Sequence, residues 1–314
     1  MMTPCIEGVT TNLSELIALR QHIHKIPLFS TPQRRSLLLG HHHARLRGRG
    51  VDFDQVRPYQ VGDDVRHVDW RVTARTREPH TKIFHEERER PIYLLVEQSP
   101  RLFFGTQRQF KSVLAAQAAA LIGWVALEHC DRVGGLVFSQ HQHQEVRPRR
   151  RQHSLLQFLQ CLAQANQQLA QPLSSTTASS TTDSLSFALH RTREVLRPGS
   201  LVVLLCDERA LTDLAEQQLK LLGRHLDLLL LPLSDPLDHR LPRAGLLDFT
   251  EQDSYLSLNT HDRSVRNRYR RYAEARQQRW VQLAHQLNTP HLPLSTQRGV
   301  IEQLHDYLTS TLGA

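Results

Sequence analysis

From Pro91 onward, apolar runs of strand length alternate with longer stretches of helical spacing. Continuous apolar strands separated by helices are typical of a mostly parallel sheet covered on both faces. The pattern therefore predicts an α/β, doubly wound, Rossmann-type sheet. The expected strands are PIYLLVE (91–97), DRVGGLVFS (131–139), SLVVLLCDE (200–208), HLDLLLLPL (225–233) and HLPL (291–294), and QEVRPR (144–149) can pair with the second as a hairpin. The expected helices cover 107–129, 153–167, 184–196, 211–223, 262–287 and 298–312.

The first 90 residues have a different character. Residues 11–26 keep helical spacing and stop at Pro27, which predicts an N-terminal helix. Residues 36–90 are rich in Gly, Arg and Asp with short alternating runs, which predict a small β-rich module of strands and turns. We therefore expect residues 1–90 to hold the helix and the β module, and residues 91–314 to form the α/β domain. The Ser/Thr-rich stretch 170–182 predicts a loop.

Composition narrows the class of protein. The formal net charge is +8, but the basic residues are dispersed among acids, so we expect no nucleic-acid partner from charge alone. The four cysteines lie far apart without a CxxC pair, which is typical of a reducing compartment. The N-terminus lacks the pattern of a signal peptide, and no apolar run approaches the about 20 residues of a membrane helix. We expect a cytoplasmic protein that does not span a membrane.

Carboxylates follow two of the predicted strands. Glu97 ends the first, with Ser99 two residues later, and Asp207 ends the third. The carboxyl ends of parallel strands meet at one edge of a sheet, where ligands bind. Carboxylate and hydroxyl oxygens suit Mg²⁺, so these residues are candidates for a divalent-ion site. Asp183, with Thr181 or Thr182 in the preceding loop, could complete it.

A second interpretation of the same residues needs no metal. They could cap strand ends and helix N-termini through local hydrogen bonds. Arg101 lies where a further hydroxyl ligand would be useful, and its guanidinium would repel Mg²⁺ if it pointed inward. Arg101 could instead replace the ion by pairing with Glu97 or Asp207. We therefore expect a weakened Mg²⁺ site or none.

The stretch 47–91 interleaves Asp and Arg side chains. Arg pairs with carboxylates through two parallel hydrogen bonds, so this pattern is typical of salt bridges and turn caps in a region with little core. Clustered carboxylates such as Asp63, Asp64 and Asp69 could alternatively serve a metal-dependent hydrolase. Elsewhere the chain has no Walker A sequence, so ATP hydrolysis would have to belong to a partner.

The same stretch carries a family resemblance. The run G-x-G-x-x-F-x-x-x-R-x-Y-x-x-G-D-D-x-R-x-x-D-W-x-x-x-A-R resembles the signature of the domain-of-unknown-function 58 family, and the likeness continues over nearly the whole chain. Its positions here are Gly48, Gly50, Phe53, Arg57, Tyr59, Gly62, Asp63, Asp64, Arg66, Asp69, Trp70, Ala74 and Arg75.

The strand-end residues resemble the metal-ion-dependent adhesion site of the von Willebrand factor A fold. That site uses Asp-x-Ser-x-Ser after the first strand, a Thr in a middle loop and an Asp after a later strand. The matching positions here are Glu97, Ser99, Arg101 and Asp207, with Thr182 and Asp183 nearest the middle loop. The first Asp has become Glu and the second Ser has become Arg, so the resemblance implies a degenerate site.

The resemblance implies a function as well. It implies a von Willebrand factor A-like domain and a non-enzymatic adaptor that works with a MoxR-type AAA+ ATPase and a client protein in the assembly or maturation of complexes. Two alternatives stay open: a metal-dependent hydrolase using the clustered carboxylates, and a basic nucleic-acid-binding protein whose affinity falls steeply with salt.

Overall fold

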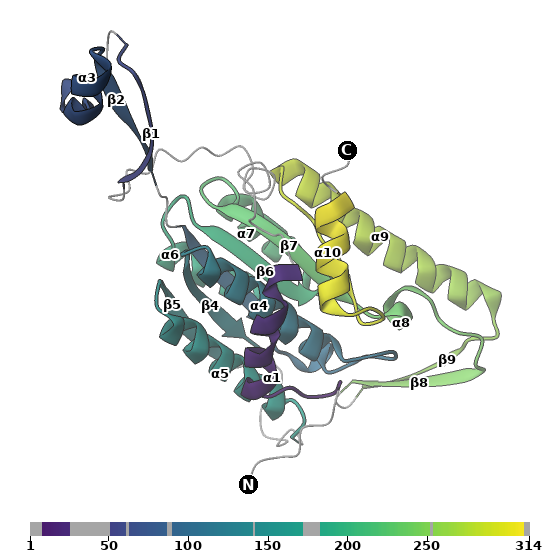
Figure 1. Ribbon diagram of the computed structural model, residues 1–314. Coiled ribbons are helices and arrows are strands. Elements are labelled where there is room, and N and C mark those ends of the chain that lie inside the picture. The colour runs from purple at the N-terminus through teal and green to yellow at the C-terminus, as the bar shows by residue number, and fades with distance from the viewer. Residues whose placement is uncertain are drawn as a thin grey trace. The chain divides into compact units, whose positions relative to one another are not determined.

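The computed structural model describes residues 8–25, 51–60, 63–86, 90–140, 142–171, 183–251 and 254–310. The chain divides into two compact units (Figure 1). One unit joins Met1–His43 to Pro91–Ala314, and the other is Ala44–Arg90. The N-terminal helix thus lies with the α/β domain, whereas the sequence grouped it with the β module.

A six-stranded sheet forms the centre of the larger unit. Neighbouring strands are parallel except at one edge, where β5 runs antiparallel to β4. Numbered one to six along the chain, the strands lie in the order 6-5-4-1-2-3, which is the doubly wound order. The predicted fold class, a von Willebrand factor A-like α/β sheet, is confirmed. The strands in spatial order are β10 (Leu294–Ser295), β7 (Asp227–Ser234), β6 (Leu201–Asp207), β3 (Pro91–Glu97), β4 (Arg132–Phe138) and β5 (His143–Arg149).

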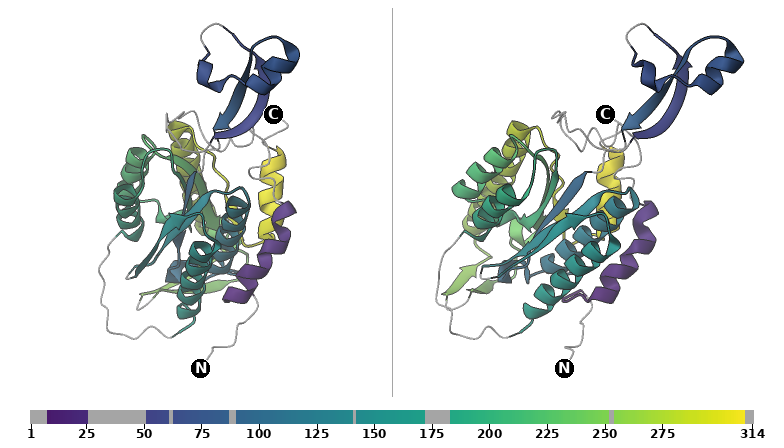
Figure 2. Two further views of the ribbon diagram at one scale, coloured as in Figure 1. Left: turned by 60° about the vertical axis from the view of Figure 1, so that its left-hand side comes forward. Right: turned by 90° about the vertical axis from the view of Figure 1, so that its left-hand side faces the viewer.

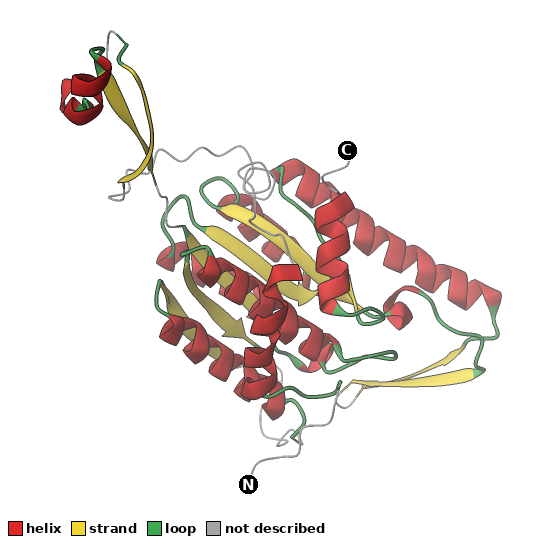
Figure 3. Cartoon of the chain, viewed as in Figure 1, coloured by secondary structure: helices red, strands yellow, loops and turns green. Residues whose placement is uncertain are grey.

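Helices cover both faces of this sheet (Figures 2 and 3). Side chains of β3 alternate between two cores: Leu94 and Val96 face one, and Tyr93 and Leu95 face the other. Because both faces are covered, the strands need apolar residues at every position. The first layer is α1 (Leu13–Ala18) with the 3-10 helix η1 (Leu19–Lys25), α4 (Lys111–Glu128), α5 (Gln152–Gln168) and α10 (Val300–Ser310). The second is α6 (Ser184–Val195), α7 (Asp213–Leu222) and α9 (Arg263–Leu287).

Helix α4 is the central helix of the first layer. Within the part of the chain that the structure describes, α4 is the one helix whose length and apolar composition would allow it to cross a membrane. Inside this unit, however, 83% of the 18-residue helix is buried. Its position in the core of the domain accounts for its apolar composition.

The N-terminal segment is tied to α4 and α5. The indole Nε1 of Trp124 donates a hydrogen bond to the carbonyl of Leu16 at 3.0 Å. The guanidinium of Arg20 lies 5.4 Å from the centre of the same ring, a cation–π contact. The backbone N–H of Thr11 donates to Asn166 Oδ1 at 2.8 Å. These contacts explain why residues from the start of the chain belong to the unit that resumes at Pro91.

The sequence analysis did not predict the hairpin between α8 (Pro236–His239) and α9. Strands β8 (Leu246–Glu251) and β9 (Ser254–Asn259) pair with each other and with no other described strand. The register puts two cross-strand apolar pairs on one face, Leu247 with Leu258 and Phe249 with Leu256. The available signal for this hairpin was the alternation of apolar and polar residues in LLDFTE and SYLSLN.

The smaller unit is an antiparallel pair with two short helices between its strands. Strand β1 (Val51–Pro58) pairs with β2 (His80–Glu86). The connection holds the 3-10 helix η2 (Val65–His67) and α3 (Trp70–Thr76), a helix that the sequence analysis did not expect. Strands and turns are thus found where the short alternating runs predicted them.

Candidate functional site

Three predicted site residues meet at the carboxyl edge of the sheet. Glu97 ends β3 and Asp207 ends β6, the two strands between which the strand order reverses. Glu97 Oε2 accepts a hydrogen bond from the backbone N–H of Asp207 at 2.9 Å, and Glu97 Oε1 accepts one from Ser99 Oγ at 2.6 Å. All three residues are buried. This is the switch point, where doubly wound folds place their ligand sites.

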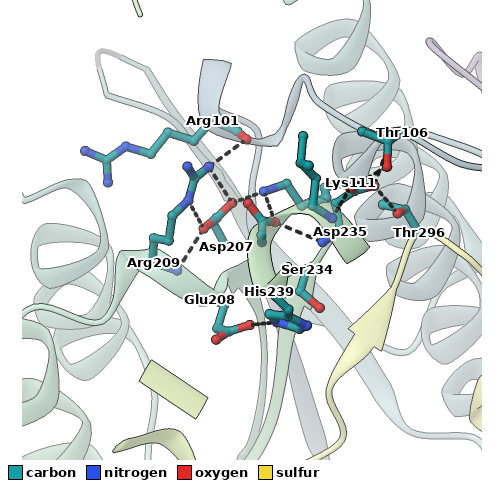
Figure 4. Close-up of polar contacts among 12 residues, drawn as sticks. Arg101, Thr106, Lys111, Asp207, Glu208, Arg209, Ser234, Asp235, His239 and Thr296 are labelled. Atoms are coloured by element: carbon teal, nitrogen blue, oxygen red, sulfur yellow. Dashed lines mark hydrogen bonds and ion pairs between the residues drawn. The ribbon is translucent and has the colours of Figure 1, made fainter. Parts of the chain in front are cut away.

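A buried lysine, absent from the predicted set, supplies the positive charge at this edge. Lys111 Nζ lies 2.6 Å from Asp207 Oδ2 and 2.9 Å from Asp238 Oδ2 (Figure 4). The ring centre of Phe104 lies 5.6 Å from the same nitrogen. Lys111 is the first residue of α4 and is fully buried. The available signal was a single lysine at the head of a long apolar run, KSVLAAQAAALIGWVAL.

A second cation reaches the same carboxylate from the solvent side. Arg209 Nε donates to Asp207 Oδ1 at 3.0 Å, and its terminal nitrogen donates to the carbonyl of Arg101 at 3.5 Å. In Figure 4 the side chain of Arg101 extends away from the carboxylates. The sequence offered Arg101 as the internal cation. In the structure the cations on Asp207 are Lys111 and Arg209, and Arg101 contributes its backbone oxygen.

The pKa values of the two carboxyl groups at the switch point are shifted in opposite directions. Burial, followed by the charge of Asp207, raises the pKa of Glu97 above its ordinary value. Burial alone would also raise the pKa of Asp207, but the charges of Lys111 and then Arg209 outweigh it, so the net pKa is lowered. Asp207 is therefore held in its ionised form, and Glu97 is the more easily protonated of the two.

Asp235, which follows β7, joins three loops at the same edge. Its two carboxylate oxygens accept hydrogen bonds from Thr106 Oγ1 and N–H at 2.6 and 2.8 Å, from Thr296 Oγ1 at 2.5 Å and from the Leu237 N–H at 2.8 Å. Burial acts to raise the pKa of Asp235, and the bonds from Thr106 and Thr296 lower it below its ordinary value. The backbone N–H of Asp235 donates to Asp238 Oδ2, which links this network to Lys111.

Helix α9 is fastened to the edge through Glu208. The carboxylate of Glu208 lies 2.7 Å from His239 Nε2 and 3.7 Å from Arg276 Nε. The buried Trp280 donates from Nε1 to the carbonyl of Glu208 at 2.9 Å. Glu208 therefore links α8 and α9 to the edge through one carboxylate oxygen and its backbone carbonyl.

Asp183 lies in a different network from the one expected. It caps α6, accepting hydrogen bonds from the Ser186 N–H at 3.0 Å and Ser186 Oγ at 2.6 Å. It also accepts a hydrogen bond from Thr212 Oγ1, the cap of α7. Its role is thus the local capping that the alternative interpretation proposed. Thr181 and Thr182 lie outside the described residues.

The carboxylates of the smaller unit are likewise engaged locally. Asp63 forms an ion pair with Arg57 at 2.7 Å, and the N–H of Gln60 donates to it at 3.0 Å. Asp64 caps η2, and Asp69 caps α3. These are the salt bridge and turn caps that the sequence also predicted, and they do not converge on a common centre. Gly62 of the signature lies outside the described residues.

Several further signature side chains of the small unit are exposed to solvent. Arg66 and Arg75 are exposed, and Trp70 keeps 69% of its surface accessible. Tyr59 is half-buried and donates to the carbonyl of Asp63 at 3.3 Å. Tyr59 and the Arg57–Asp63 pair therefore stabilise the turn after β1, whereas Trp70 contributes little to a core.

The residues at the carboxyl edge do not fit the weak Mg²⁺ site that the sequence left open. Over the ranges that the structure describes, no group of three or more His, Cys, Asp or Glu side chains is arranged to hold a metal ion. Asp207 and Asp238 already share the charge of Lys111, and Arg209 adds another. A divalent ion placed between these carboxylates would meet two cations at short range.

A cavity of about 270 Å³ lies elsewhere, between β5 and the start of α5. Arg147, Arg149 and Arg151 line it. Arg149 pairs with Val133 at the start of β4, so this cavity belongs to the amino edge of the sheet. It therefore plays no part in the site formed by Glu97, Asp207 and Lys111.

The doubly wound sheet, its antiparallel edge strand and a polar centre at the switch point define a von Willebrand factor A-type domain. The chain belongs to the family described as "Protein of unknown function DUF58", which matches residues 55–279. This confirms the family predicted from the signature.

The chain is also similar to individual proteins. It is 28% identical over 280 residues to "Uncharacterized protein Mb1516" of Mycobacterium bovis and to "Uncharacterized protein Rv1480" of Mycobacterium tuberculosis, over 87% of this chain and 84% of each relative. Among solved structures it is similar to the conserved hypothetical protein BatB from Bacteroides thetaiotaomicron, with a TM-score of 0.41 and 8% identity over 72% of this chain and 100% of that one. It is also similar to the manganese-loaded TRAP protein from Plasmodium vivax, with a TM-score of 0.27 and 18% identity over 46% of this chain and 57% of that one.

Proposed function

We propose that this protein is a non-enzymatic adaptor that docks a partner protein on the carboxyl edge of its sheet. One observation carries the proposal: the charged groups at this edge are bonded to one another. Lys111 pairs with both Asp207 and Asp238, Arg209 pairs with Asp207, and Glu97 accepts hydrogen bonds from Ser99 and from the backbone of Asp207. Buried groups held in this way make the edge above them rigid, whereas a hydrolytic centre needs a base or metal that is open to its substrate.

The hydrolase alternative receives less support from the contacts of the small unit. Asp63, Asp64 and Asp69 each hold a turn or a helix N-terminus. A purified protein that stays inert toward phosphoesters and peptides in Mg²⁺ or Mn²⁺ would agree with the adaptor function. Turnover that is lost on changing Asp64 or Asp69 would contradict it.

The proposed partner is a MoxR-type AAA+ ATPase together with its client. The support is the family to which the chain belongs and the absence of a Walker A sequence from the chain, which leaves ATP hydrolysis to another protein. We also propose a cytoplasmic location, because the widely separated cysteines are typical of a reducing compartment.

The experiment is an affinity capture from native lysate with the tagged full chain. Gln107→Trp puts a bulky side chain on the exposed loop next to Thr106. Gln282→Trp puts the same side chain on an exposed position near the C-terminal end of α9, and is the matched control. Capture of an AAA+ ATPase by the wild type and the control, with loss in Gln107→Trp, supports the proposal. If both variants capture the ATPase equally, docking on the carboxyl edge is contradicted. If no ATPase is captured, the proposed partner is contradicted.

A further inference from the structure

The carboxyl edge is organised around one buried ammonium group. Two carboxylates from separate segments converge on Lys111 Nζ, at 2.6 Å from Asp207 and 2.9 Å from Asp238. The side chain of Lys111 is 0% exposed, and those of Asp207 and Asp238 are 1% and 7% exposed. Carboxylate oxygens are also the type of ligand that a hard cation binds, and here they converge on a buried ammonium group.

The position of Lys111 in its helix shows why it is there. A positive charge at the first residue of an α-helix is opposed by the helix dipole, which favours acidic groups at this end. The first turn of α4 carries no acidic residue that could compensate. The charge of Lys111 is therefore stabilised by Asp207 and Asp238 across the edge and by the ring of Phe104, not by its own helix dipole.

The groups on the open side of this centre are guanidinium groups. Arg209 bonds Asp207 and still keeps 41% of its side chain exposed, and Arg101 is exposed beside it. The bond from Arg209 to the carbonyl of Arg101 holds the two loops together. Lys111 offsets one of the two negative charges of Asp207 and Asp238, and Arg209 offsets the other. The guanidinium of Arg101 extends away from these carboxylates (Figure 4).

We infer that Lys111 is a built-in cation in the place of a divalent ion, and that the edge binds an acidic side chain of its partner through Arg101 and Arg209 without metal. This inference rests on the proposed adaptor function and names the chemistry of the partner. Arginine offers a planar fork of donors that matches a carboxylate. Arg209 is already held by Asp207, so less of its side-chain freedom is lost on binding.

The first test concerns the cation and needs no partner. Mn²⁺ is titrated into the full chain by calorimetry, for the wild type, Lys111→Ala and the double variant Lys111→Ala with Asp238→Asn. We expect no binding to the wild type, one Mn²⁺ bound to Lys111→Ala, and weaker binding to the double variant. Stoichiometric Mn²⁺ on the wild type that is lost in Asp207→Asn overturns the inference, and so does a folded Lys111→Ala without Mn²⁺ affinity.

The loss of Lys111 can also prevent folding, and a second measurement covers that case. Thermal unfolding of Lys111→Met is followed with and without Mn²⁺, with the wild type as reference. Recovery of folded protein by Mn²⁺ in the variant alone supports the inference. Equal stabilisation of both proteins overturns it.

The second test concerns the acidic ligand, with fluorescein-labelled hexaglutamate as the probe in an anisotropy titration. Arg101→Gln and Arg209→Gln should each weaken binding about tenfold, which corresponds to about 1.4 kcal/mol. Arg193→Gln is the matched control, because Arg193 is exposed in the last turn of α6, whose end leads into the start of β6 at the opposite edge. EDTA should have no effect. Dependence on metal, or equal affinity in all variants, overturns the inference.

The two proposals can fail separately. If a partner is captured but EDTA releases it, the proposed role of Lys111 as a built-in cation is contradicted, whereas the adaptor function is not. If no ATPase is captured, the proposed partner fails, whereas the Mn²⁺ titration still decides the role of Lys111.

Discussion

Lys111 Nζ and Asp207 Oδ2 lie 2.6 Å apart, although 96 residues separate them along the chain. Helix α4 begins where strand β6 ends, so the pair joins the two halves of the sheet at the point where strand order reverses. Both side chains are buried, so loss of either partner would leave a charge without a counter-charge inside the protein, unlike the loss of an ion pair on the surface.

Removing the ammonium should strongly destabilise the larger unit. Lys111→Met leaves Asp207 and Asp238 buried next to each other without their shared counter-charge, and breaking a buried pair in this way costs about 3–5 kcal/mol. The free energy of unfolding, measured in urea, should fall by that amount. Lys220→Met is the control, because Lys220 pairs with Glu216 on the surface and its change should cost about 0.5 kcal/mol. A similar loss in both variants would contradict the importance of burial.

Glu97→Gln should change how stability depends on pH. Burial and Asp207 raise the pKa of Glu97 in the folded state above its ordinary 4.5. The folded protein then binds more protons than the unfolded chain, so this group makes the free energy of unfolding fall as pH rises above about 4.5. The amide cannot titrate, so the variant should gain stability relative to the wild type over that range. Parallel profiles from urea unfolding between about pH 4 and about pH 7 would contradict the shift.

Asp235→Ala should loosen the carboxyl edge. The change removes four accepted hydrogen bonds and leaves Thr296 Oγ1 buried without its acceptor, at a cost of about 3 kcal/mol. The folded-state pKa of Asp235 is lowered, so its contribution is present above about 3.8 and is lost as pH falls through the folded pKa. The difference between wild type and variant should therefore shrink in acid. Asp213→Ala, at a side chain 89% exposed, should change stability by about 0.5 kcal/mol or less.

Trp70 should be the tryptophan that is open to solvent. Trp124 and Trp280 are buried at 2% and 1% exposure, whereas Trp70 is exposed at 69%. Iodide should therefore quench one component of the fluorescence, and Trp70→Phe should remove it while leaving stability unchanged within about 0.5 kcal/mol. Quenching that persists in Trp70→Phe, or a large loss of stability, would show that this side chain is covered in solution.

The fold could be predicted because its signal is local and repeated. Strands buried on both faces are apolar at every position, as in LVVLLCD of β6, and helices of the expected spacing separate them. Glu97 and Asp207 were placed together correctly, because parallel strands that both end in acid bring those acids to one edge.

The rest of the site depends on three-dimensional packing. In the sequence, an aspartate that caps a helix, such as Asp183, looks the same as one that binds an ion. Lys111 begins α4, Asp235 caps α8 and Asp238 lies in α8. Only the packing of α4 against the sheet brings Lys111 to Asp207 and Asp238. Arg101 was considered as an internal cation because it takes the position of the second Ser in the motif, but its side chain points outward (Figure 4).

The bond between Thr11 and Asn166 spans 155 positions and has a consequence for biosynthesis. The first helix leaves the ribosome long before the surface that will cover its apolar side has been translated. Domains generally form as units during synthesis, so this leading segment has to wait through the translation of Ala44–Arg90. Contacts between such distant positions also slow folding. A nascent chain arrested before α5 should therefore leave its N-terminal residues open to protease.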